Sequence, residues 1–162
     1  MPDALSKPQA LMVRLVAVLV PGLIILGVLW YGLSADVHTR LWHHIFGRMD
    51  GPMTFRFILQ PAMAALAALH DGVQDARADR APYFWTMLTN PAKRAGRLRE
   101  GFVSTARIIL LGLGMDALYQ YFVLKTFYPG EMAVIALLLA FVPYVLLRGP
   151  ITRVARVWMS RR

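Results

Sequence analysis

Four polar side chains lie inside apolar stretches of this sequence and are its candidates for a functional site. Arg56 and Gln60 are four residues apart, as are Asp116 and Gln120, so each pair shares one face of a helix. Polar groups in apolar helices are costly in lipid and normally face a partner. An arginine opposite an aspartate gives either an interhelical ion pair, supported by the two amides, or a proton or cation site centred on Asp116.

Two glycines beside Asp116 bear on both interpretations. Gly112 and Gly114 permit a close approach of another backbone, or the local unwinding that ion sites in membrane proteins use. An unpaired Arg or Asp in hydrocarbon would cost on the order of a few kcal/mol, so pairing is expected under either interpretation. The sequence therefore predicts that Arg56 and Asp116 are paired. It leaves open whether the pair is structural or functional.

The other residue types that could bind a metal or catalyse a reaction form no recognisable site. His38, His43 and His44 are separated by five residues and one, whereas two imidazoles on one helical face need a spacing of four. The absence of cysteine excludes a disulfide framework, a thiolate metal site and a cysteine nucleophile. No Ser-His-Asp set or phosphate-binding glycine loop is recognisable. We therefore predict no catalytic residue, no metal site and no cofactor.

Apolar helices must position the polar residues. Residues 15–33 contain no charge. The length of this uncharged stretch is what a bilayer about 30 Å thick requires of a spanning helix. The hydrophobic content of 57% is too high for an ordinary soluble domain of this size. We predict an all-α membrane protein in which residues 1–162 form a single membrane domain, a four-transmembrane-helix bundle. The expected spans are residues 11–33, 53–70, 101–124 and 131–148.

The distribution of basic residues predicts the topology. The chain has 18 Lys and Arg residues and a net charge of +9. If all four stretches cross, 13 basic residues lie on one side and three on the other, with Arg56 and Arg107 inside spans. This is the asymmetry of the positive-inside rule, and it places both termini in the cytoplasm. Without a crossing at 53–70, the basic residues of segment 71–100 would lie outside.

The connections between spans are expected to lie at the two membrane surfaces. Segment 34–52 has an amphipathic pattern and is predicted to be an outer interfacial helix. Segment 71–100 is a cytoplasmic basic segment, in which Asn90–Pro91 should begin the helix that leads into the third span. Gly149–Pro150 is expected to end the fourth span. The C-terminal tail 151–162 then forms an amphipathic helix on the inner leaflet.

Three strings of the sequence resemble a known group of proteins. RFILQPAMAALAALHDGVQDAR, FYPGE and PYVLLRGPITRVARVW are similar to an uncharacterised family of small bacterial inner-membrane proteins. The resemblance covers most of the chain from about residue 53 onward. It implies a multi-pass protein of the bacterial inner (plasma) membrane. It carries over no activity, ligand, cofactor or site residue.

These patterns predict partners and a class of function. The basic residues flank apolar segments, which favours contact with membrane lipids, especially anionic head groups at the cytoplasmic face, and no nucleic acid. The small residues Ala64 and Ala68 favour contact with a neighbouring helix, within the bundle, in another membrane protein or in a homo-oligomer. We expect a non-enzymatic integral membrane protein that acts as a scaffold, accessory subunit or envelope component. The alternatives are a small oligomeric transporter or permeation unit that uses the Arg56/Asp116 cluster, and a membrane-embedded enzyme acting on a lipid.

Overall fold

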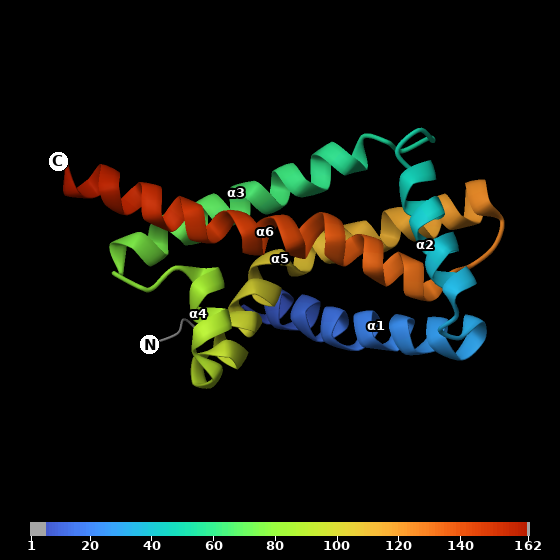
Figure 1. The fold of residues 1–162 in the computed structure, drawn as a ribbon, viewed down its shortest axis with the longest axis horizontal. Helices are drawn as coiled ribbons and strands as arrows, with labels where there is room; N and C mark the ends of the chain where they lie inside the picture. The colour runs from blue at the N-terminus through green and yellow to red at the C-terminus, as the bar shows by residue number, and fades with distance from the viewer. Residues whose placement is uncertain (1–5, 162) are drawn as a thin grey trace.

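The computed structural model describes residues 6–161, and every regular element in that range is a helix. The helices are α1 (Lys7–Tyr31), α2 (Ala35–Gly47), α3 (Arg56–Arg77), α4 (Tyr83–Thr89), α5 (Pro91–Tyr119), a π-helical turn η1 (Gln120–Leu124) and α6 (Pro129–Ser160). The four long helices lie along the long axis of the molecule (Figure 1). In this view α1 and α5 run from left to right, whereas α3 and α6 run from right to left. The short helix α2 lies across the right-hand end, and α4 lies at the left.

Side-chain caps set where several helices begin. Ser6 and Gln9 form a capping box at the start of α1, and the Ser34 hydroxyl accepts a hydrogen bond from the Val37 amide at the start of α2. Asn90 caps α5, with Pro91 at its first position. The predicted start of this helix at Asn90–Pro91 is therefore confirmed, and the helix continues without a break into the third predicted span.

The helix that contains the second apolar stretch, 53–70, continues to Arg77, so the start of segment 71–100 is helical. One predicted boundary is wrong. Gly149–Pro150 does not end the fourth helix, because α6 continues to Ser160, so residues 151–160 of the predicted tail 151–162 belong to α6 and form no separate element. Close packing against α3 explains the continuity. A Cβ atom on Gly72 would lie 3.1 Å from the Arg148 carbonyl oxygen and 2.7 Å from Ile151 Cγ2, so the two helices touch on both sides of Pro150.

Three helices in the described part of the chain are long and apolar enough to span a membrane. They are α1, α5 together with η1, and α6. This is the pattern of a multi-pass membrane protein. The helix α3 has 22 residues but is not among the three, so the predicted count of four spans is not confirmed.

The core between α3, α5 and α6 is built from small side chains. Ala64 and Ala68 on α3, and Ala136 and Ala140 on α6, are completely buried. Gly112 on α5 packs against Ala136, because a Cβ atom added to this glycine would lie 3.3 Å from the Ala136 Cβ. Small residues let helices approach closely, as in membrane helix pairs. The close approach brings polar side chains near the helix ends into contact.

The contact between α1 and α6 depends on Gly27. A Cβ atom at Gly27 would lie 2.6 Å from the Gly130 backbone nitrogen, and backbone cannot move aside as a side chain can. Gly27→Ala is expected to lower the free energy of unfolding by about 1–3 kcal/mol through overpacking, measured by denaturant titration in detergent. Gly22→Ala on the same helix is the matched control, because no atom lies within 4 Å of its Cβ position. Equal effects of the two substitutions would contradict the close helix contact.

Candidate functional site

Seven polar side chains from four elements meet at the end of the bundle where α2 lies. We call them the Asp116 network. Its members are Arg40, His44, Arg48, Arg56, Asp116, Gln120 and Glu131. The residues come from α2 with its C-cap Arg48, the first turn of α3, the end of α5 with η1, and the first turn of α6. Two carboxylates therefore share three guanidinium groups at this end of the bundle, of which those of Arg48 and Arg56 are buried.

Asp116 is the centre of this network and is fully buried. Its Oδ1 atom lies 2.6 Å from Arg56 Nη2 and 3.2 Å from Arg48 Nε. Its Oδ2 atom accepts a hydrogen bond of 2.7 Å from the Gln120 side-chain amide. The ion pair predicted between Arg56 and Asp116 is thus present. Gln60 is buried as well, but its Nε2 atom faces Met115 Sδ at 3.7 Å and it makes no bond to Asp116.

Glu131 is the second carboxylate of the Asp116 network. It accepts a hydrogen bond of 3.2 Å from Arg40 Nε, and its other oxygen lies 2.8 Å from His44 Nδ1. Arg48 lies between the two acids, because its Nη1 atom is 3.6 Å from Glu131. No guanidinium nitrogen of Arg48 makes a hydrogen bond within residues 6–161. The buried charge of Arg48 is therefore balanced by its ion pairs with Asp116 and Glu131.

The basic residues of α2 were missed by sequence reasoning. Arg40, His44 and Arg48 are four residues apart and therefore lie on one face of the helix. The amphipathic pattern correctly predicted a helix within 34–52. However, its arginines were counted as charges on the outer surface. The spacing of four could have shown that these basic residues share one face. It could not show their acidic partners, because Asp116 lies 68 residues and Glu131 83 residues beyond Arg48 in the chain.

The charges of the Asp116 network limit its chemistry. Three arginines oppose two carboxylates, which leaves one excess positive charge when His44 is neutral. Arginine does not lose its proton in proteins. If Asp116 became neutral, Arg56 and Arg48 would lose a partner that they both contact. Because two buried arginines depend on this one carboxylate, the geometry favours an interhelical ion pair over a proton or cation site at Asp116.

A second network lies toward the opposite end of the bundle. We call it the Asp75 network. Its members are Asp71, Asp75, Arg97, Glu100, Tyr144 and Arg148. Asp75 Oδ2 accepts a hydrogen bond of 2.8 Å from Arg148 Nε, and its Oδ1 accepts one of 3.1 Å from Arg97 Nη1. Three carboxylates oppose two arginines here, and Arg80 lies 3.7 Å from Asp75 at the rim.

Sequence reasoning did not identify the Asp75 network. Segment 71–100 was interpreted as a cytoplasmic basic segment, and Arg148 as the last residue of the fourth span. Asp71 and Asp75 are four residues apart, as are Tyr144 and Arg148, so the same spacing rule that identified Asp116 applied here. The difference is that these residues lie at the ends of the apolar stretches, where charged side chains are unremarkable.

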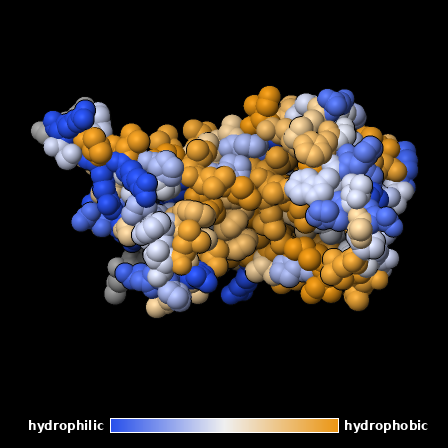
Figure 2. All heavy atoms as spheres, viewed as in Figure 1, coloured by the Kyte–Doolittle hydropathy of each residue, from blue (hydrophilic) through white to orange (hydrophobic). Residues whose placement is uncertain are grey.

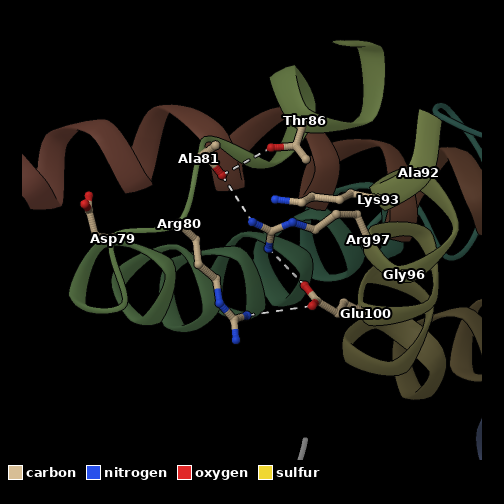
Figure 3. Close-up of a pocket in the computed structure, with 9 residues that line it drawn as sticks. All are labelled: Asp79, Arg80, Ala81, Thr86, Ala92, Lys93, Gly96, Arg97 and Glu100. Atoms are coloured by element: carbon tan, nitrogen blue, oxygen red, sulfur yellow. Dashed lines mark hydrogen bonds and ion pairs between the residues drawn. The ribbon is translucent and has the colours of Figure 1, made fainter. Parts of the chain in front are cut away.

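A pocket of about 490 Å³ opens beside the Asp75 network, between the end of α3, α4 and the start of α5. Figure 3 shows the Arg97 guanidinium between the Ala81 carbonyl and Glu100, with Lys93 extended alongside it. Next to it, the Tyr83 hydroxyl donates a hydrogen bond of 2.5 Å to the Arg97 carbonyl. Burial raises the pKa of Tyr83 to about 12, so the phenol stays a neutral donor at physiological pH.

No family model, curated protein or solved structure matches this chain. Among the described residues, no group of three or more His, Asp or Glu side chains could hold a metal ion. His38 instead accepts a hydrogen bond of 2.9 Å from the Trp42 indole, and His44 belongs to the Asp116 network. The geometry of the two networks must therefore carry any functional argument.

Proposed function

We propose that this chain is a non-enzymatic integral protein of the bacterial inner membrane that works by binding. It would act as a scaffold, accessory subunit or envelope component through helix–helix and lipid contacts. Four helices would cross the membrane: α1, α3, α5 with η1, and α6. The observation that carries the proposal is the inverted polarity of α3, because the polar face of this helix is buried and its apolar face is exposed.

The burial pattern of α3 is the reverse of that of a soluble amphipathic helix. Arg56, Gln60 and Asp75 are at most 1% exposed, whereas Ile58 is 75% and Leu66 is 66% exposed. In lipid, apolar side chains are favoured on the protein surface, whereas charged side chains are costly there and turn toward partners inside the bundle. The polar face also explains why the mean hydropathy of α3 is low. Its 22 residues correspond to about 33 Å, enough to cross a hydrocarbon layer of about 30 Å.

The surface of the molecule supports the same placement. Figure 2 shows an apolar central region, with hydrophilic residues gathered toward both ends of the long axis. Large apolar side chains of α1 are exposed in the same way, including Val18 at 72% and Leu29 at 75%. Such a continuous apolar surface marks contact with lipid or with another membrane helix.

Charge supports a topology with both termini in the cytoplasm. The antiparallel arrangement of Figure 1 gathers segment 71–100 and the C-terminal part of α6 at one end, and these carry nine of the 18 Lys and Arg residues. Only Arg40, Arg48 and Lys125 belong to the connections at the other end. The positive-inside rule places the basic end in the cytoplasm.

Packing between the two networks favours binding over transport. The layers that separate them contain Ala64, Ala68, Ile109, Ala136 and Ala140, all completely buried. These apolar side chains offer no group that could pass an ion or proton from one network to the other. Asp116 is the ion-pair partner of two arginines and Asp75 of three, which favours a structural role for both buried carboxylates over a catalytic one.

Cysteine labelling tests the crossing of α3. The natural sequence has no cysteine, so single probes can be introduced at exposed positions: Asp50→Cys, Lys93→Cys and Ser160→Cys. A membrane-impermeant maleimide applied to spheroplasts is expected to label position 50. Positions 93 and 160 should react only after the membrane is permeabilised, because α3 carries the chain from one side to the other.

Comparing the labelling of the three positions provides an internal control. Positions 93 and 160 must behave alike, since α5 and α6 both cross and return the chain to the same side. If positions 50 and 93 are labelled from the same side, α3 does not cross, and the proposed topology is wrong.

A further inference from the structure

An apolar groove lies between α1, α2 and the start of α6, beside the Asp116 network. Its volume is about 150 Å³, below the 300–1,000 Å³ or so of typical ligand pockets, so it fits a segment of alkyl chain. Apolar side chains from all three helices line it, among them Ile24, Val28, Leu41 and Val134. Ile24 and Val28 are also partly exposed on the surface of α1, so the groove is continuous with the exposed apolar face of that helix.

One end of the groove carries a positioned cation. Arg40 lines the groove, and its side chain is 29% exposed. Its guanidinium carbon lies 4.7 Å from the ring centroid of Tyr31 and 4.5 Å from that of Tyr128. Glu131 accepts the Nε–H bond at 3.2 Å. The Tyr31 ring is itself fixed, because its hydroxyl donates to the Phe127 carbonyl at 2.8 Å.

These contacts use the Nε atom of Arg40 and leave its two terminal nitrogens able to bind a ligand. The two terminal nitrogens of Arg40 have no hydrogen bond or ion pair to any described residue. An arginine edge with two parallel N–H donors matches the geometry of a phosphate group. Because its orientation is already set by two aromatic rings and a carboxylate, little side-chain entropy would be lost on binding.

We propose that this groove binds one acyl chain of an anionic phospholipid, whose phosphate contacts the terminal nitrogens of Arg40. The charge of the site selects the lipid class, because the Asp116 network carries one excess positive charge that an anionic head group would neutralise. The acyl chain would lie against Val28 and Val134. The inference rests on the proposed membrane placement of α1 and α6, and it does not need α3 to cross.

Native mass spectrometry of the purified full chain in detergent tests this site. The probes are phosphatidylglycerol and phosphatidylcholine with the same acyl chains, titrated separately. We expect one phosphatidylglycerol bound in preference to phosphatidylcholine. Arg40→Gln should weaken phosphatidylglycerol binding at least about tenfold, since a charge-assisted phosphate contact is lost. Val28→Trp fills the groove and leaves the Asp116 network intact, and it should also abolish the bound lipid.

Lys125→Ala is the matched control, because it removes one positive charge from the same end of the bundle and Lys125 does not line the groove. It should bind phosphatidylglycerol like the natural chain. Equal binding of the two lipids, or binding unchanged in Arg40→Gln or Val28→Trp, would overturn the proposal. A failure here is separable from a failure of the α3 topology, because the binding measurement is made on purified protein and the labelling is made in membranes.

Discussion

Asp75→Asn is expected to lower the free energy of unfolding by about 3 kcal/mol, because it removes the negative charge that Arg97 and Arg148 share in the bundle interior. Both arginines are buried, at 8% and 3% exposure, so water cannot replace the lost partner. Glu100 lies 3.0 and 3.2 Å from the same two guanidinium groups and limits the damage. The effect is measured by denaturant titration in detergent, followed by circular dichroism.

Asp79→Asn is the matched control for this prediction. Asp79 lies just after α3, its side chain is 94% exposed, and its only ion pair is with Arg156 at 3.6 Å among the described residues. Its φ of 49° lies in the left-handed region, which asparagine tolerates as well as aspartate. The control should change stability by less than about 1 kcal/mol, as exposed ion pairs do. Equal stabilities of the two variants would show that the Asp75 network is not a stabilising element.

The helices could be predicted because periodicity and capping residues are local. They indicated a helix within 34–52, where α2 lies, and placed the start of α5 correctly. Arg56 and Asp116 were identified because each stands out in an apolar stretch. The structure brings them to 2.6 Å although they are 60 residues apart in the chain.

The Asp75 network could not be predicted on the same grounds. Asp75 and Arg148 are 73 residues apart, and each lies at the end of an apolar stretch where a charge is ordinary. Only the packing of α3 along α6 shows that they meet inside the bundle. The same packing overrides the helix-breaking tendency of Gly149–Pro150, which a local rule could not anticipate.

The burial of Arg48 also changes how the Asp116 network must be tested. Exchanging the charges of Arg56 and Asp116 would place an arginine at position 116, where Arg48 lies 3.2 Å from the present carboxylate. Two positive charges would then face each other, so the exchange would not restore stability even though the native pair exists. A test must remove charges and not reverse them.

Asp116→Asn is expected to have the largest effect on stability, about 3–5 kcal/mol, because Arg56 then has no acidic partner among residues 6–161. Arg56→Gln in the same chain should recover part of the loss by removing the unpaired charge, while Arg48 keeps Glu131 at 3.6 Å. Asp50→Asn, an exposed position at the same end, is the control and should be nearly neutral. Denaturant titration of the natural chain, the single variants Asp116→Asn and Arg56→Gln, and the double variant gives the coupling energy between positions 56 and 116. A coupling near zero, or an Asp116→Asn chain as stable as the natural one, would show that the pair does not stabilise the bundle and would favour the alternative of a proton or cation site.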